Sequence, residues 1–426
     1  MNKEVRPSRS GTNQTFEVSE TSKVSSRQLH SAYKPSGVAW LGDIPAHWES
    51  MRLKFVARLL YGDSLAADDR EDGEFAVFGS NGQVGTHTRA NTLAPALIIG
   101  RKGSFGKVNY SAQPCFAIDT TFIADARSAK ADLRWLFYAI ALLGLDTISQ
   151  DSAVPGLSRE FAYDQWLPVP SESEQRAIAA YLDRETARLD ALIAKKERLI
   201  ELLQEKRTAL ISHAVTRGLD AHAPLKDSGV EWLGKIPVGW EVKRLKSLFT
   251  FLDSRRIPLS SEERATLAKE YPYYGASGII DYVENYLFDE PLILVAEDGA
   301  NLFSRSSPLA FVARGKYWVN NHAHILKPFD SLIDYWSYVL AIIVYDPWIT
   351  GSAQPKLTKD NLGTLALPVP PMNERRAIAA HLDRETAKID ALVAKVRQAI
   401  ETLKEYRTAL ISAAVTGKID VREEVP

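Results

Sequence analysis

The sequence contains two copies of one unit, and this repeat constrains the fold more than any other feature. The segment KPSGVAWLGDIPAHWE at residues 34–49 returns as KDSGVEWLGKIPVGWE at 226–241. The segment EQRAIAAYLDRETARLDALIAK at 174–195 returns as ERRAIAAHLDRETAKIDALVAK at 374–395, with 17 of 22 positions identical. A period of 192 to 200 residues is far too long for a solenoid, so the chain is a duplicated domain pair. Because the ends of the copies agree and their middles diverge, we favour one scaffold with two different surfaces over a duplication without functional consequence.

Composition excludes several classes of protein. The chain has 426 residues, of which 45% are hydrophobic and 25% charged, so a wholly disordered or fibrous protein is excluded. The net charge of -1 gives no sign of nucleic-acid or membrane binding. Cys115 is the only cysteine, which excludes an internal disulfide and a cysteine-rich metal site. Residues 1–30 lack the apolar stretch of a signal peptide, and no apolar run is long enough to span a bilayer. We expect a cytoplasmic protein without membrane association.

The repeated ends predict two long helices. Apolar residues follow seven-residue rows over about 40 residues without Gly or Pro, and each segment begins just after a proline cluster. At about 1.5 Å per residue such a helix is about 60 Å long and would overhang a domain of this size, which argues against two helices that each lie on their own domain. We therefore expect an antiparallel coiled coil between the two copies. The predicted pairing residues are Ile178, Leu182, Leu189, Leu192, Leu199, Leu203 and Leu210 in the first helix, with Ile378, Leu382, Ile389, Leu392, Val396, Leu403 and Leu410 in the second.

The divergent middles predict α+β domains. Each has short Val, Ile, Phe and Tyr runs broken by Gly, Asn and Ser, an apolar strand that leads into a tight turn, and a helical run at 131–144 or 332–345. The fold class is thus α+β, with two pseudo-repeated globular domains separated by two long conserved helices.

Motifs for catalysis or metal binding are absent or incomplete. The segment GRKGSFGKV at 100–108 resembles a phosphate loop, but its glycine spacing is wrong and Val108 stands where a hydroxyl should bind magnesium. Asp346-Pro-Trp348 lacks the second proline of an amino-methyltransferase motif. His322 and His324 have no further ligand at metal-binding spacing, so we expect a surface or hydrogen-bonding role for them. We predict no catalytic residue and no metal site in this chain.

Polar loops in both middles suit contact with DNA. Arg can pair with guanine edges and Asn with adenine, whereas Lys, Ser and backbone amides position phosphates. The alternative is that these are merely solvated loops, and neither middle is basic: 13 basic against 15 acidic residues over 34–170, and 15 against 17 over 226–370. If DNA is bound, partner subunits should therefore supply much of the positive surface. The candidate DNA-binding residues are Ser80, Asn81, Arg101, Lys102, Ser104, Lys107, Asn109, Arg159, Ser277, Asn301, Ser304, Arg305, Asn320, Asn321, His322, Gln354 and Lys356.

The repeated motifs resemble the specificity (S) subunit of type I restriction-modification systems. The resemblance rests on WLGDIPAHW at 40–48 and WLGKIPVGW at 232–240, which open the copies, and on LPVP at 167–170 and 367–370, which is followed by EQRAI or ERRAI. It covers about residues 34–420, and Arg375 stands where the family usually has Gln.

This resemblance implies a domain plan and a function. It implies a flexible extension at 1–33, target-recognition domains at 34–170 and 226–370, and conserved helical regions at 171–225 and 371–426. Each domain would recognise one half of a bipartite, asymmetric site in double-stranded DNA. The helices would space the halves and hold two modification (M) subunits that use S-adenosylmethionine to methylate adenine. Two restriction (R) subunits would add ATP- and magnesium-dependent translocation and cleavage, so this chain would hold no cofactor. The alternatives are a coiled-coil adaptor that binds proteins without DNA specificity, and a self-sufficient nuclease or methyltransferase.

Overall fold

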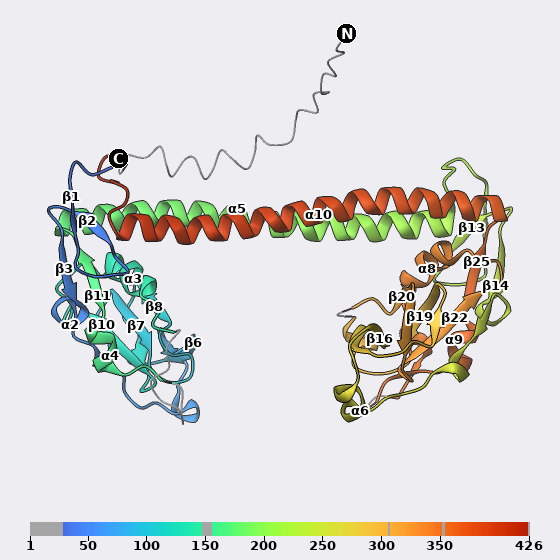
Figure 1. The fold of residues 1–426 in the computed structure, drawn as a ribbon, viewed down its shortest axis with the longest axis horizontal. Coiled ribbons are helices and arrows are strands. Elements are labelled where there is room, and N and C mark those ends of the chain that lie inside the picture. Colours follow the sequence, from blue (N-terminus) through green and yellow to red (C-terminus); the bar gives the residue numbers. More distant parts are fainter. Residues whose placement is uncertain (1–28, 147–155, 306, 352–353, 425–426) are drawn as a thin grey trace, which may run out of the picture. The chain divides into compact units, whose positions relative to one another are not determined.

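The computed structural model describes residues 29–146, 156–305, 307–351 and 354–424 (Figure 1). The chain divides into two compact units, Met1–Lys196 with Gln398–Pro426, and Glu197–Arg397. Each unit therefore contains one globular region together with part of each long helix. The domains predicted from the sequence are single continuous ranges, whereas the first of these units combines two separate stretches of the chain. The predicted ranges stay predictions.

The first unit is built on a four-stranded sheet of order β4-β10-β7-β8. Its two central strands, β10 and β7, are antiparallel, and all their residues are buried. They are buried because one face of the sheet packs against helix α3 and the other against a second sheet of order β6-β5-β9. The elements are β1 (Tyr33–Pro35), β2 (Asp43–Pro45), β3 (Glu49–Arg52), α2 (Leu53–Val56), β4 (Leu60–Tyr61), the 3-10 helix η1 (Ala67–Asp69), β5 (Phe75–Gly79), β6 (Gly82–His87), β7 (Ala96–Gly100), β8 (Val108–Ser111), β9 (Phe116–Ala117), β10 (Thr121–Asp125), α3 (Leu133–Leu142), α4 (Arg159–Asp164), β11 (Trp166–Val169) and the start of α5 (Glu172–Arg217).

The second unit repeats this plan with a four-stranded sheet of order β15-β22-β19-β20 and a second sheet of order β17-β16-β21-β18. Helix α8 packs its Trp336 and Val339 into the same core as Ile293 and Val295 of β19. The elements are β12 (Leu225–Asp227), β13 (Lys235–Pro237), β14 (Glu241–Arg244), η2 (Leu245–Ser247), β15 (Phe249–Phe251), η3 (Asp253–Arg255), α6 (Ser261–Thr266), β16 (Tyr271–Gly275), β17 (Gly278–Val283), β18 (Phe288–Asp289), β19 (Leu292–Ala296), α7 (Asn301–Ser304), β20 (Ala310–Ala313), β21 (Lys316–Val319), β22 (Ala323–Pro328), α8 (Ile333–Ala341), η4 (Asp346–Trp348), β23 (Ile349–Thr350), β24 (Lys356–Leu357), α9 (Lys359–Thr364), β25 (Ala366–Val369) and the start of α10 (Met372–Val415).

The repeated beginning and end of each copy lie side by side. Strand β3 pairs with β11 in the first unit, and β14 pairs with β25 in the second. The indole of Trp48 donates to the Glu174 carboxylate over 3.2 Å, and Trp240 donates to Glu374 over 3.0 Å. The sequence similarity of the ends therefore reflects one junction, which joins the opening motif to the first turn of a long helix.

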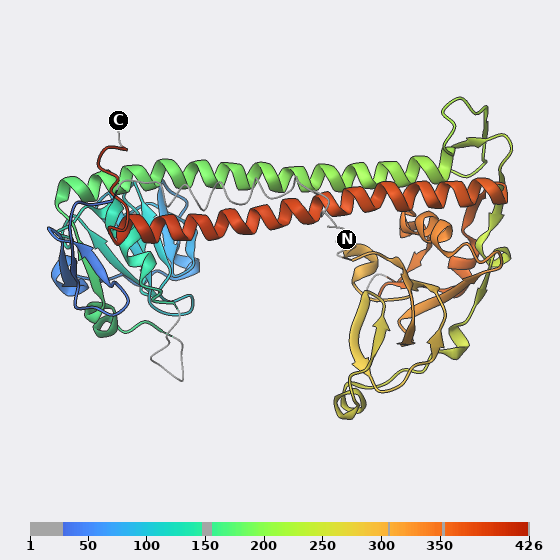
Figure 2. The same cartoon turned by 45° about the horizontal axis from the view of Figure 1, so that its top comes forward.

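Helices α5 and α10 run antiparallel within each unit, as Figures 1 and 2 both show. In the first unit Asp190 accepts from Arg407 over 2.9 Å, and in the second Asp390 accepts from Arg207 over 3.1 Å. The two pairs are equivalent in the repeat, so the helices pair by the same rule in both units. The predicted α+β class and the antiparallel pairing of the long helices are confirmed.

Most of the predicted pairing residues are shielded from solvent, but three are not. Leu192, Leu199 and Leu392 are 39%, 40% and 44% exposed, so they do not belong to the buried seam. All three belong to the rows that start at Ile178 and Ile378, whereas the row Leu382, Ile389, Val396, Leu403 and Leu410 stays buried over its whole length, so only one of the two rows keeps facing the protein interior. Buried members are Ile178, Leu182, Leu189, Ile378, Leu382, Ile389, Val396, Leu403 and Leu410, and Leu203 and Leu210 are half-buried.

Candidate nucleic-acid interface

In the first unit, three separate segments meet where strand β7 ends. The Arg101 amide donates to the carbonyl of Thr120 over 2.8 Å, and the Leu157 amide donates to the Arg101 carbonyl over 2.8 Å. The chain must turn tightly here, because a Cβ on Gly100 would lie 2.2 Å from a backbone oxygen of the following loop. This edge brings together the predicted residues Arg101, Lys102 and Arg159.

Two arginine side chains share one aromatic ring at this edge. The guanidinium carbons of Arg101 and Arg159 lie 5.1 Å and 4.9 Å from the centre of the Tyr61 ring, and Arg101 lies 6.0 Å from Phe122. Stacking on a ring restrains a guanidinium while leaving its N–H groups directed outward. Among the described residues, no carboxylate forms an ion pair with Arg101, and the ion pair of Arg159 to its neighbour Glu160 is long at 3.8 Å. The pair can therefore offer N–H donors to a guanine edge or a phosphate.

The turn between β5 and β6 adds a second group of predicted residues to this surface. The Lys107 ammonium donates to both oxygens of Asn81, over 2.7 Å and 2.9 Å, so the two side chains form one exposed polar pair. Ser80 is buried and donates to the Thr120 carbonyl over 2.7 Å. Its geometry indicates a structural role, whereas contact of Asn81 and Lys107 with DNA stays a prediction. Ser104 is exposed in the adjacent loop and Asn109 is half-buried on β8.

In the second unit, Glu297 occupies the position that Arg101 has in the first. Its amide donates to the His322 carbonyl over 2.9 Å, and the Leu357 amide donates to its carbonyl over 2.7 Å. These two backbone hydrogen bonds are equivalent to the two that Arg101 makes with Thr120 and Leu157. The backbone at this position is therefore paired in the same way in both units, whereas the charge of the side chain is reversed. The carboxylate of Glu297 accepts from Arg256 over 2.5 Å and lies 3.2 Å from the Lys356 ammonium.

A buried histidine extends this ionic cluster. His324 is 1% exposed, and its ring nitrogens lie 2.7 Å from an Asp253 oxygen and 2.8 Å from the Leu357 carbonyl. Burial alone would raise the pKa of Asp253, but hydrogen bonds from His324 and from the Ile325 amide outweigh it and the pKa is lowered. Burial acts in the same way on Glu297, where the hydrogen bond from Arg256 and the nearby positive charges again lower the pKa. Both carboxylates are thus held as anions among cations.

Other candidate residues of the second unit are also engaged within the protein. His322 bonds to Asp298 over 2.7 Å, and Arg305 forms an ion pair with Asp346. Asn301 and Asn320 are buried and bond to the backbone, which indicates that they shape their loops. Ser277 lies in the turn between β16 and β17, Ser304 ends α7, Asn321 lies in the turn before β22, and Gln354 precedes β24. Contact of these residues with DNA stays a prediction, and residues 153–155 and 352–353, which precede the candidates Arg159 and Gln354 in the sequence, lie outside the described residues.

Sequence reasoning missed Tyr61, Arg256 and Glu297. Tyr61 stands in a two-residue strand with no motif around it, and Arg256 and Glu297 are 41 residues apart. A weak signal did exist, since Arg101 and Glu297 both follow the apolar strand that precedes a tight turn in each copy. Comparison of the two copies position by position could have found the charge reversal, but not its partners.

Two groups of potential metal ligands occur among the described residues: Asp253, Glu297 and His324, and His30, His47 and Glu174. In the first group both ring nitrogens of His324 already have protein partners, and Arg256 and Lys356 neutralise Glu297. This group is therefore complete without a metal. In the part of the chain that the structure describes, none of the helices has the length and apolar character needed to cross a membrane.

Comparisons with known proteins agree with this architecture. A family model described as the type I restriction modification DNA specificity domain matches twice, over residues 45–202 and 237–402. A putative type I restriction enzyme specificity subunit of Haemophilus influenzae is 34% identical over 165 residues, which cover 38% of this chain and only 39% of that protein. The EcoDI specificity subunit of Escherichia coli is 20% identical over 405 residues, 89% of this chain and 90% of that one.

A solved structure shows the same fold. It is titled as a study of complex assembly and conformational transition of the type I R-M system, and the alignment covers 87% of this chain and 98% of that chain with a TM-score of 0.64 and 14% identity. The two matches to the family model together cover most of the sequence. The loop edges of the two copies differ in charge, as described above. The chain therefore belongs to the type I restriction-modification DNA specificity family.

Proposed function

We propose that this chain selects the DNA target of a type I restriction-modification complex, with each globular region recognising one half of a bipartite, asymmetric site. One observation carries the proposal: equivalent loop edges present Arg101 in the first unit and the neutralised Glu297 cluster in the second. Arg101 can donate to a guanine edge, whereas the Glu297 carboxylate is 11% exposed and already paired with Arg256 and Lys356, so the second edge does not present the same donor to a base. The two units would therefore recognise different half-sites.

The long helices would hold the partner subunits. Leu192, Leu199 and Leu392 are exposed on otherwise charged helices, which supports contact with another protein. The proposed partners are double-stranded DNA, two M subunits that use S-adenosylmethionine to methylate adenine, and two R subunits that use ATP and magnesium. The specificity family is non-catalytic, and we propose that the catalytic groups and cofactors reside on these partners in the cytoplasm. The family match does not favour an adaptor without DNA specificity.

The first experiment is single-molecule methylome sequencing of the source cell with and without the gene. Deletion should remove one interrupted, two-part adenine methylation motif. An unchanged methylome, with the protein confirmed as expressed, would contradict the proposal.

Domain exchange tests whether the halves are separate. Replacement of residues 34–170 with another domain of the family should change one half of the methylated motif and leave the other unchanged. The matched control replaces residues 226–370 and should change the opposite half. A change in both halves after either exchange would contradict the modular proposal.

Helix length tests the role of the helices as a spacer. Four extra residues in both α5 and α10 would lengthen each helix by about 6 Å, close to two base pairs at about 3.4 Å each. The methylated motif should then keep both half-sites and gain spacer. New half-sites with an unchanged spacer would show that the helices do not set the separation.

A further inference from the structure

Three side chains of types that can bind a metal ion lie close together in the first unit, although they are far apart in the sequence. They are His30 on the N-terminal arm (residues 29–33), His47 in the opening motif, and Glu174 in the first turn of α5. One ligand atom from each lies within 4.8 Å of the others, and the His47 Nε2 atom lies 2.7 Å from the Glu174 Oε1 atom. None of these atoms belongs to the candidate nucleic-acid interface.

The second copy shows that the junction itself does not need these histidines. There Glu374 receives the indole of Trp240 as Glu174 receives that of Trp48, but Gly239 replaces His47. The counterpart of His30 is His222, which is exposed. Among the described residues, the first copy therefore places two imidazoles around a carboxylate that is already hydrogen-bonded, and His47 is the one of the two that the second copy lacks in sequence.

The imidazole of His30 is buried. The residue is 7% exposed, and neither ring nitrogen forms a hydrogen bond with any of the residues that the structure describes. The nearest acidic oxygen outside the cluster, on Asp420, lies 3.7 Å from its Nδ1 atom and already pairs with Arg422. Burying a polar nitrogen without a bond is unfavourable, so such a group needs an explanation. A cation bound between the imidazoles and the carboxylate would supply one.

We propose that His30, His47 and Glu174 bind one divalent transition-metal ion of the zinc class. Two imidazoles and one carboxylate are ligands that Zn²⁺ accepts, whereas Mg²⁺ and Ca²⁺ prefer oxygen ligands alone. On binding, the ion takes the place of the proton that His47 shares with Glu174. The Asp420 carboxylate at the edge of the cluster adds negative charge beside His30.

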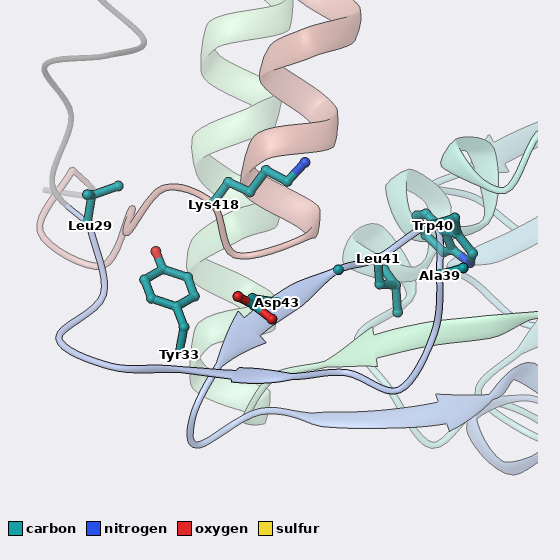
Figure 3. A pocket seen from close by; sticks show the side chains of 8 residues that line it. Leu29, Tyr33, Ala39, Trp40, Leu41, Asp43 and Lys418 are labelled. Carbon is teal, nitrogen blue, oxygen red and sulfur yellow. The ribbon is translucent and has the colours of Figure 1, made fainter.

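The ion would fasten the N-terminal arm to the helix junction. The arm is also attached through Tyr33, whose hydroxyl donates to the Gly417 carbonyl over 3.1 Å, and through the Ala32 carbonyl, which accepts from the Ala46 amide over 2.9 Å. Figure 3 shows Leu29 and Tyr33 of the arm beside the segment after α10 that carries Lys418. A metal that joins His30 to Glu174 would hold the arm, the opening motif and α5 together, which is a structural role and not a catalytic one.

Titration with Co²⁺ tests the site. The untagged full-length chain is stripped with a chelator and titrated with Co²⁺, whose visible absorption changes when protein ligands replace water around the ion. We expect about one equivalent of tight binding that Zn²⁺ displaces. His30→Ala and His47→Gly should each weaken binding at least about tenfold. His47→Gly places in the first copy the residue that the second copy already has, so the junction should still fold.

The second copy provides the matched control. His222→Ala removes the exposed counterpart of His30 and should leave Co²⁺ binding unchanged. A melting curve adds an independent readout, because Zn²⁺ should raise the unfolding midpoint of the wild-type chain and not that of His47→Gly. The proposal is overturned if the wild-type chain binds no more Co²⁺ than the double variant His30→Ala/His47→Gly, or if all variants bind equally.

Discussion

The two globular regions share a backbone but stabilise its central edge in different ways. In the first unit, Arg101 stacks on Tyr61 and Phe122, so a cation is held by aromatic rings. In the second, Glu297 and His324 stand at the equivalent strand positions, and an ionic cluster with Arg256 takes the place of the rings. A duplicated fold can therefore keep its main-chain hydrogen bonds while the side chains at its functional edge reverse in charge.

The difference also concerns how exposed the charges are. Arg101 is half-buried over a ring that is itself 48% exposed, so its N–H groups face solvent or a ligand. The side chains of Arg256 and Glu297 are only 15% and 11% exposed. The first edge is thus suited to donate to DNA, whereas much of the charge in the second is used to hold loops in place. Four experiments can break or sharpen this comparison.

Removal of one buried cation should have the largest effect. Arg256→Ala removes the cation that donates to the buried Glu297 carboxylate, and loss of one partner of a buried ion pair costs about 3–5 kcal/mol. The matched variant Arg101→Ala should cost only about 0.5–1 kcal/mol, because it removes a partly exposed cation–π contact. Denaturant unfolding of both variants measures the two costs. Equal losses would contradict the proposed difference between the edges.

Two glycines at the ends of the long helices should differ in their sensitivity to alanine. Gly417 and Gly218 have φ of +71° and +78°, which an L side chain adopts only under strain. A Cβ on Gly417 would lie 2.4 Å from the Pro45 ring, whereas a Cβ on Gly218 would lie 2.8 Å from the flexible end of Glu374.

We therefore expect Gly417→Ala to cost about 2–4 kcal/mol and Gly218→Ala about 1–2 kcal/mol, since the rigid ring adds an overpacking cost to the backbone strain. Thermal unfolding of the two variants under identical conditions gives the comparison. A larger cost for Gly218→Ala would show that the two junctions differ from the geometry described above.

Acid should weaken the second edge through its carboxylates. The pKa of Asp253 is lowered in the folded chain, so its contribution to stability is complete above the unfolded value near about pH 4 and is lost as the pH falls through the folded value. Asp253→Asn should therefore be less stable than wild type at pH 6, with the difference shrinking below about pH 4. Unfolding free energies measured from pH 3 to pH 7 give both curves. A difference that does not change with pH would show that the charge of Asp253 is not what stabilises the cluster.

The helix ion pairs should give the smallest effect and no difference between units. Asp190–Arg407 and Asp390–Arg207 are largely exposed, and such pairs contribute about 0–1 kcal/mol. Asp190→Asn and Asp390→Asn should each lower the free energy of unfolding by less than about 1 kcal/mol, and high salt should reduce the loss. If one variant loses several times more than the other, the helices do not pair by the same rule in both units.

Much of the fold could be predicted because its signals are local or repeated. The helical runs predicted at 131–144 and 332–345 are helices α3 (Leu133–Leu142) and α8 (Ile333–Ala341), and the long helices begin after the prolines as expected. Asp132 caps α3 by accepting from the Trp135 amide over 2.8 Å, a signal within three residues. The exposed Leu192, Leu199 and Leu392 show where prediction from local signals fails. A seven-residue repeat identifies rows of apolar residues on a helix, but it does not say which row faces a neighbouring element.

The candidate interface was predictable only as a set of loops. Arg101 and Arg159 were both named as candidates, but the tyrosine ring that both contact and the burial of Ser80, Asn301 and Asn320 were not foreseen. A polar residue in a turn has the same local sequence pattern whether it faces solvent or bonds to the backbone of a distant loop. Local patterns therefore could not separate the residues that shape the loops from those that are free to contact DNA.

The sequence alone determined that there are two copies of one unit, that long helices join them, and that their middles differ. These properties depend on periodicity and on residues near each other in the chain. Only the tertiary structure decided that Glu297 meets Arg256, that Arg101 meets Tyr61, and that His30 meets Glu174. The physical reason is that charge, burial and ligand geometry depend on the nearest atoms in space, and here those atoms come from segments 40 to 144 residues apart.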